Sequence, residues 1–153
     1  MERTISSLAG LDAFAEEFVR ALAPRTGEAT LVTLSGELGA GKTAFTKSLA
    51  RVFGVGEVVN SPTFVLEKIY ELPREMGGHR VSTHFARLVH IDAYRLASGR
   101  DLAPLGFDEL MKDSGNLVLL EWPEKVADGL PQSARALSFS VGDNDVRTIS
   151  YDA

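Results

Sequence analysis

The stretch Gly36-Glu37-Leu38-Gly39-Ala40-Gly41-Lys42-Thr43 fits the phosphate-binding pattern G-x-x-x-x-G-K-[ST]. An apolar, β-branched run, Ala29 to Leu34, precedes it, and apolar residues recur at helical spacing in Thr43 to Phe53 after it. In this order, backbone N–H groups of the loop and the N-terminus of the helix point at phosphate oxygens. The pattern therefore predicts an α/β protein with a P-loop NTPase fold that binds a nucleoside triphosphate.

Within this loop, Lys42 is expected to reach the β and γ phosphates and the Thr43 hydroxyl to ligate Mg²⁺. The glycines run G-x-x-G-x-G, which differs from the G-x-G-x-x-G fingerprint and argues against a dinucleotide cofactor. We expect the whole stretch to contact the nucleotide: Gly36, Glu37, Leu38, Gly39, Ala40, Gly41, Lys42 and Thr43.

Composition narrows the class of protein. A length of 153 residues with 44% hydrophobic residues predicts a single domain over residues 1–153. The absence of cysteine excludes disulfides and thiolate metal sites. The net charge of −5, without a basic cluster, argues against tight direct binding to nucleic acid. Neither a signal peptide nor a membrane-spanning run is visible, so we expect a cytoplasmic protein with no membrane partner.

An amphipathic helix is predicted near the N-terminus. Ser6 or Ser7 can cap it, and Pro24 and Gly27 stop it. Its apolar stripe is expected to pack on the sheet and consists of Leu8, Leu11, Phe14, Phe18 and Leu22.

Two further strands are predicted at Thr63 to Leu72 and His84 to Ile91. The connection Pro73 to Ser82 is short and contains Gly77-Gly78, which indicates a hairpin rather than a helical crossover. Strands joined in this way pair antiparallel, so the sheet is expected to be mixed, mostly parallel and flanked by helices.

The C-terminal half begins with a predicted helix that starts at Asp101 and includes Leu105, Phe107, Leu110 and Met111. The continuous apolar run Asn116 to Leu120 is typical of a central strand that is buried on both faces. Pro123 to Asp128 is expected to be helical or a turn, and Ala134 to Val141 and Val146 to Tyr151 form a closing hairpin.

Two carboxylates follow predicted strands. A phosphate loop needs an acidic residue at the end of a neighbouring strand to hold Mg²⁺ through its waters, and Asp92 follows Leu88 to Ile91 in this way. Glu121 follows the central strand and is expected at the same edge, where it orients the attacking water or shares the metal. The alternatives are a turn or helix cap for Asp92, and a strand end with Trp122 as packing for Glu121.

Ser61-Pro62-Thr63-Phe64 lies where many NTPases place a segment that senses the γ phosphate. Ser61 or Thr63 is therefore a candidate contact to phosphate or Mg²⁺, and a proline-defined turn is the alternative. The histidines His79, His84 and His90 lack metal-ligand spacing and are interpreted as structural or solvent-facing. At most, His90 is expected to support Asp92.

Taken together, four motifs closely resemble the TsaE family, the bacterial ATPase component of tRNA threonylcarbamoyladenosine synthesis. They are the phosphate loop, Ser61-Pro-Thr-Phe64, His90-Ile-Asp-Ala-Tyr-Arg-Leu96 and Glu121-Trp-Pro-Glu124, and they occur in the family's order. The segment Pro73 to Thr83 looks longer than the family's usual connection.

The resemblance implies a slow ATPase that works with TsaB and TsaD, meets tRNA only indirectly, and uses hydrolysis to reset that complex. By motif match it also implies that Lys42 holds phosphate, that Thr43 and Glu121 bind Mg²⁺, and that Asp92 is an essential acidic residue. Trp122 matches the family's tryptophan.

Two other functions are compatible with the phosphate loop. A small-molecule kinase needs a lid that carries arginines and an acceptor pocket, and the only candidate insertion, Pro73 to Thr83, has just Arg74 and Arg80 nearby. A nucleotide-dependent switch would bind without significant hydrolysis. GTPase activity is disfavoured because D-x-x-G after the second strand and N-K-x-D are missing.

Overall fold

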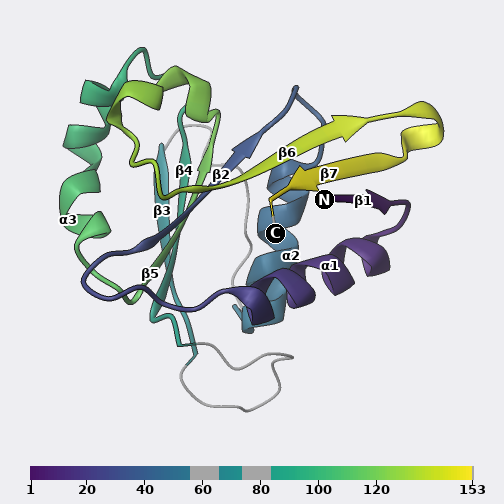
Figure 1. The fold of residues 1–153 in the computed structure, drawn as a ribbon, viewed down its shortest axis with the longest axis horizontal. Coiled ribbons are helices and arrows are strands. Elements are labelled where there is room, and N and C mark those ends of the chain that lie inside the picture. Colours follow the sequence, from purple (N-terminus) through teal and green to yellow (C-terminus); the bar gives the residue numbers. More distant parts are fainter. Residues whose placement is uncertain (56–65, 74–83, 153) are drawn as a thin grey trace.

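The computed structural model describes residues 1–55, 66–73 and 84–152, and within them one seven-stranded sheet carries helices on both faces (Figure 1). In sheet order the strands are β1 (Glu2–Ile5), β7 (Arg147–Tyr151), β6 (Arg135–Val141), β2 (Thr30–Ser35), β5 (Asn116–Glu121), β4 (Arg87–Asp92) and β3 (Glu67–Glu71). The strands β6, β2, β5 and β4 run parallel, while β3 and β7 run against their neighbours. The predicted α/β fold with a mixed, mostly parallel sheet is confirmed.

Helices cover the two faces of the sheet and bury two hydrophobic cores. The helices α1 (Leu8–Ala21) and α2 (Lys42–Phe53) pack together on one face, and α3 (Phe107–Met111) lies on the other (Figure 1). Short 3₁₀ helices lie between these elements. The first, η1 (Gly99–Leu105), precedes α3; η2 (Pro123–Lys125) and η3 (Ala127–Gly129) follow β5; and η4 (Asp143–Asp145) lies between β6 and β7. All six residues of β5 are buried, which confirms it as an interior strand.

The helix α1 begins where its cap was predicted. The Oγ atom of Ser7 accepts a hydrogen bond from the backbone N–H of Gly10 at 3.0 Å. Leu8, however, is 61% exposed, so its predicted place in the packed stripe is wrong. The buried stripe begins three residues later, at helical spacing, with Leu11, Phe14, Ala15, Phe18 and Val19.

Two elements differ from the sequence prediction. The strand β1 was not predicted, because four residues are too few for a clear alternation, and its pairing with β7 creates it. The single helix predicted from Asp101 is wrong: η1 starts at Gly99, and Gly106, with φ 72°, separates it from α3. A left-handed residue ends one helix and allows the chain to start another in a new direction.

The remaining strand predictions are confirmed, except that β4 begins at Arg87 and not at the predicted His84. The strands β3 and β4 pair antiparallel, and β6 and β7 form the closing hairpin. Residues 63–65 of the predicted strand and most of the predicted hairpin connection lie outside the described residues. The predicted turn after β5 consists of η2 and η3. In the described ranges, no helix combines the length and apolar character that crossing a membrane requires.

Candidate functional site

A glycine-rich loop, Gly36 to Gly41, joins the end of β2 to the first residue of α2. Gly36, Gly39 and Gly41 have φ values of 145°, 80° and 109°, which side chains rarely tolerate. A Cβ atom at Gly36 would also lie 2.5 Å from the carbonyl oxygen of Phe139. The loop therefore needs glycine at these positions to turn sharply into the N-terminus of α2.

The sheet register places two acidic side chains beside this loop. Glu121 ends β5 and pairs with Leu34 of β2 on one side and with Asp92, the end of β4, on the other. All three strands are parallel, so their carboxyl ends meet at one edge, as the sequence predicts. The alternating pleat turns Glu121 toward the face that carries α2.

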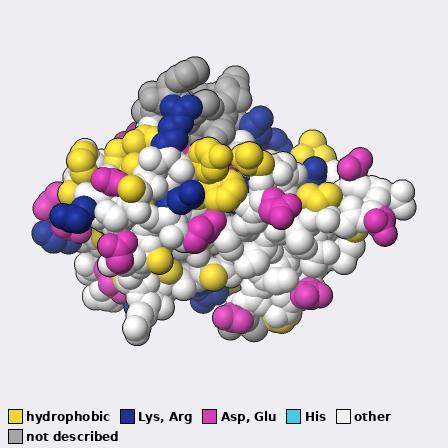
Figure 2. All heavy atoms as spheres, turned by 90° about the horizontal axis from the view of Figure 1, so that it is seen from above, with side chains coloured by type: hydrophobic (Ala, Val, Ile, Leu, Met, Phe, Trp, Pro, Cys, Tyr) yellow, Lys and Arg dark blue, Asp and Glu magenta, His cyan; other side chains and the backbone are white. Residues whose placement is uncertain are grey.

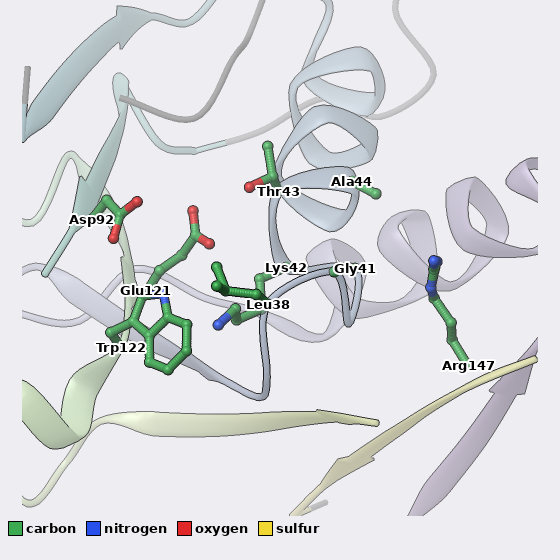
Figure 3. A pocket seen from close by; sticks show the side chains of 10 residues that line it. Leu38, Gly41, Lys42, Thr43, Ala44, Asp92, Glu121, Trp122 and Arg147 are labelled. Atoms are coloured by element: carbon green, nitrogen blue, oxygen red, sulfur yellow. The ribbon is translucent and has the colours of Figure 1, made fainter. Parts of the chain in front are cut away.

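The loop and the two carboxylates surround a hollow of about 290 Å³. Figure 3 shows the Asp92 and Glu121 carboxylates side by side, with Thr43 at the start of α2 next to them. Of the predicted site residues, Leu38, Gly39, Gly41, Lys42, Thr43, Asp92 and Glu121 line the hollow. Gly36, Glu37 and Ala40 shape the loop without lining the hollow, and Ser61 and Thr63 lie outside the described residues.

Lys42 is only 4% exposed although it carries an ammonium group. Its Nζ atom donates a hydrogen bond to the carbonyl oxygen of Gly36 and lies 3.4 Å from the centre of the Trp122 ring. Burial lowers the pKa of Lys42, and the negative charges of Glu121, Glu124 and Asp92 act in the opposite direction. The ammonium is thus held at the hollow, between the glycine-rich loop and the Trp122 ring.

Trp122 adopts an unusual backbone conformation, with φ 60° and ψ 52°. Left-handed residues other than glycine are strained and are concentrated at functional sites. Its backbone N–H donates to the Leu34 carbonyl at 3.2 Å, and its ring lies 5.0 Å from that of Tyr94. The strained turn directs the indole back over Lys42 instead of away from the sheet edge (Figure 3).

Asp92 forms the turn contact that the sequence offered as one alternative, and it lies where the proposed metal role would place it. One oxygen of its carboxylate accepts a hydrogen bond from the Tyr94 backbone N–H at 3.0 Å, which fixes the turn after β4. The same side chain lines the hollow beside Glu121. The backbone N–H of Ala93 donates to the Glu121 carbonyl at 3.0 Å and ties the two strand ends together.

His90 is fully buried, and its Nε2 atom lies 2.5 Å from Oε2 of Glu121. The hypothesis that His90 at most supports Asp92 is therefore corrected, since the ring meets the other carboxylate of the site. The pleat explains the difference, because both side chains point to the α2 face from adjacent strands. His84 is exposed, as predicted, and His79 lies outside the described residues.

The oxygen atoms at this edge fit a magnesium ion. The hydroxyl of Thr43 and the carboxylates of Asp92 and Glu121 are hard donors, which Mg²⁺ prefers. Among the described residues, no group of three or more histidine or acidic side chains is placed to hold a metal ion by itself. Mg²⁺ at nucleotide sites is held by one or two protein oxygens, waters and phosphates, so a full cage is unnecessary.

Sequence reasoning missed Arg147. It belongs to β7, far from the loop in sequence, yet it lines the hollow. A Cβ atom at Gly41 would lie 3.1 Å from its Cδ atom, and its buried Nε has no hydrogen-bond partner within the described residues. In Figure 3 it lies across the glycine-rich loop from Trp122. No local motif marks this arginine, because only the β1–β7–β6 pairing brings it to the site.

The edge that carries the hollow lies at the top of Figure 1 and faces the viewer in Figure 2. Figure 2 shows hydrophobic side chains gathered near the middle of this face, with acidic and basic side chains around them. Exposed hydrophobic residues include Leu38 of the loop and Tyr94, at 73% and 46% exposure. An apolar centre with a charged rim is common at surfaces that bind other molecules.

Comparison with known proteins gives one consistent family. The model of the family described as threonylcarbamoyl adenosine biosynthesis protein TsaE matches residues 5–149. A Treponema pallidum protein named tRNA threonylcarbamoyladenosine biosynthesis protein TsaE is 39% identical over 74% of this chain and 75% of its own length. A Rickettsia prowazekii protein of the same name is 33% identical over 96% and 91%. The crystal structure of Bacillus subtilis YdiB superposes with a TM-score of 0.72 at 26% identity, over 99% of this chain and 83% of that one.

Proposed function

Because this chain belongs to the TsaE family of threonylcarbamoyl adenosine biosynthesis proteins, we propose that it is a Mg²⁺-dependent ATPase of tRNA N6-threonylcarbamoyladenosine synthesis. One observation carries the ATPase part of the proposal. Lys42, Thr43, Asp92 and Glu121 come from three separate elements and line the same hollow at the end of a glycine-rich loop. This is the set of groups that phosphoryl transfer requires.

The loop would bind the phosphates of ATP. Its backbone N–H groups and the N-terminus of α2 attract negative charge, and Lys42 is already buried beside them. The ammonium of Lys42 would leave the Gly36 carbonyl and contact the β and γ phosphates. Because the Lys42 side chain is buried, this contact is stronger than it would be at an exposed surface.

Hydrolysis would then proceed by attack of a water oxygen on the γ phosphorus. The bond between the γ phosphorus and the bridging oxygen breaks, and ADP and inorganic phosphate leave. Asp92 and Glu121 would orient the water and hold the metal with Thr43. Mg²⁺, held by these residues, would neutralise negative charge on the phosphates.

We further propose that the protein acts with TsaB and TsaD in the cytoplasm and meets tRNA through them. The surface supports a protein partner more than a nucleic acid, because the chain carries a net charge of −5 and the face over the site has an apolar centre (Figure 2). Hydrolysis by the isolated chain is expected to be slow, with TsaB and TsaD changing its rate.

A Lys42→Ala variant tests the proposal. A hydrogen bond to a charged group contributes about 1.5–3 kcal/mol, so ATP affinity should fall about 10- to 100-fold and hydrolysis should stop. Calorimetric titration with ATP and phosphate release measure the two effects, and Lys47→Ala on the same helix is the control. Unaltered binding and hydrolysis in a folded Lys42→Ala protein would overturn the ATPase assignment.

The same preparation separates the two alternatives. A kinase would transfer the γ phosphate to a metabolite, which a screen with labelled ATP detects as a new phosphorylated compound. A switch without significant hydrolysis would assemble with TsaB and TsaD equally well, and remain assembled equally long, with ATP and with a non-hydrolysable analogue. The proposed ATPase should release phosphate to water and dissociate faster with ATP.

A further inference from the structure

A buried polar contact joins His90 to Glu121. His90 is 0% exposed and Glu121 is 3% exposed, and 2.5 Å separates Nε2 from Oε2. The ring is surrounded by apolar neighbours of the same face, including Leu88 on its own strand and Leu119, its register partner on β5. Burying a polar ring at such a position destabilises the fold unless the ring is hydrogen-bonded.

Among the residues that the structure describes, the second ring nitrogen of His90 makes no hydrogen bond that could explain why the ring is buried. His90 Nδ1 is buried and has no partner within the described residues. An unpartnered buried nitrogen destabilises the fold by about 1–3 kcal/mol, which an apolar side chain would avoid. The ring is therefore not part of an extended core network, and its one polar contact in the described part of the chain is Glu121.

The contact involves only one of the two carboxylate oxygens of Glu121. His90 holds Oε2 from the buried side, at the level of the sheet, while the side chain still lines the hollow next to Asp92 and Thr43. A glutamate side chain has three rotatable bonds, and anchoring one oxygen removes much of that freedom. Anchoring Oε2 therefore also restricts the directions that the second oxygen can take.

We infer that His90 is a positioning residue that orients Glu121 for the magnesium ion and the attacking water. The inference rests on the proposed ATPase function and adds a residue through which the metal site is tuned. Partners that orient a metal-ligating side chain typically alter metal affinity about 10- to 100-fold when they are removed. His90 does not line the hollow, so its effect on the site would act through Glu121.

Two substitutions of His90 form a matched pair. In His90→Gln, the side-chain amide nitrogen lies close to the former Nε2 position and can still donate to Glu121. In His90→Asn, the same amide is one methylene shorter and cannot reach the carboxylate. Leu119→Val is the packing control. Leu119 pairs with His90 in the sheet, and the substitution removes one methylene from the same core.

The measurement is ADP binding by calorimetry over a series of Mg²⁺ concentrations, which does not depend on turnover. His90→Asn should raise the Mg²⁺ concentration that gives half of the full Mg²⁺ effect by about 10- to 100-fold, with ADP affinity in EDTA unchanged. His90→Gln should stay within about threefold of wild type, as should Leu119→Val. Unfolding in urea, recorded for each variant, shows how much stability each has lost.

A double variant tests whether His90 acts through Glu121. In the Glu121→Gln background, adding His90→Asn should change the Mg²⁺ requirement little, because the oriented carboxylate is already gone. Equal Mg²⁺ requirements for His90→Asn and Leu119→Val would overturn the inference, and so would a full additional loss in the Glu121→Gln background. If His90→Asn does not fold, failure of His90→Gln to keep the wild-type requirement overturns it instead.

Different results would contradict the ATPase function and the role of His90. If wild-type protein does not bind ADP or hydrolyse ATP, the proposed function is wrong. If wild type binds and hydrolyses while the His90 variants match it at every Mg²⁺ concentration, the function stands and the role of His90 is wrong.

Discussion

The ammonium of Lys42 lies 3.4 Å from the centre of the Trp122 ring, within reach of a cation–π interaction. The two residues come from different elements, the first turn of α2 and the strained turn after β5. A ligand that draws Lys42 toward phosphate must alter this contact. Trp122, the single tryptophan of the chain, therefore reports directly on the site.

We predict that ATP or ADP with Mg²⁺ changes the emission of Trp122 saturably. Loss or rearrangement of the Lys42 contact changes the charge next to the indole, and a fluorescence titration measures this. Lys42→Ala should start from a different emission and respond less. Flat wild-type emission, while calorimetry shows binding, would separate Trp122 from the nucleotide site.

Asp92→Asn and Glu121→Gln should keep most nucleotide affinity and lose turnover by about 100-fold or more. Groups that position metal and water act mainly in the transition state, whereas Lys42 and the loop hold the ground state. Calorimetry and phosphate release distinguish the two effects. Normal hydrolysis by both variants would show that the carboxyl edge is not the reactive site.

Arg147→Gln is expected to lower ATP affinity about 10-fold, because the guanidinium is the cationic group on the far side of the loop from Lys42. Arg135→Gln is the control, since Arg135 is exposed on the neighbouring strand and lies outside the hollow. Calorimetric titration with ATP compares the two. Equal ATP affinities of the two variants would show that Arg147 only packs against Gly41 and does not contribute to ATP binding.

Gly129→Ala should destabilise the fold by about 1–3 kcal/mol, as overpacking does. A Cβ atom at Gly129 would lie 2.8 Å from the Cα of Gly99, where η1 and η3 cross with backbone against backbone. In Gly142→Ala, the nearest atom would be 3.6 Å away, so little change is expected. Urea unfolding of both variants tests the difference, and equal stabilities would contradict it.

The stabilising effect of Asp101 should depend on pH. Backbone hydrogen bonds from Ala97 and Ser98 lower the pKa of its carboxyl. A pKa that is lower in the folded state adds stability above the unfolded pKa and loses it as pH falls through the folded value. The difference in unfolding free energy between wild type and Asp101→Asn should therefore be largest near neutral pH and shrink below about pH 4. A difference that stays constant or grows in acid would contradict this.

Much of the fold was predictable from the sequence because the signals are local. The phosphate-binding pattern, the apolar run of β5 and the caps of α1 each depend on residues close together in the chain. Where local signals were weak, prediction failed. The four residues of β1 form a strand only because β7 pairs with them, and the predicted helix from Asp101 is divided at Gly106.

The sequence by itself determined the phosphate loop and that Asp92 and Glu121 each follow a predicted strand, because a loop motif and a strand end are both visible in consecutive residues. Tertiary structure alone decided which groups meet. The pairing of β7 brings Arg147 to Gly41, the turn at Trp122 folds its ring over Lys42, and the pleat joins His90 to Glu121. Such contacts depend on register and side-chain direction across strands that are distant in sequence, and no spacing along the chain encodes them.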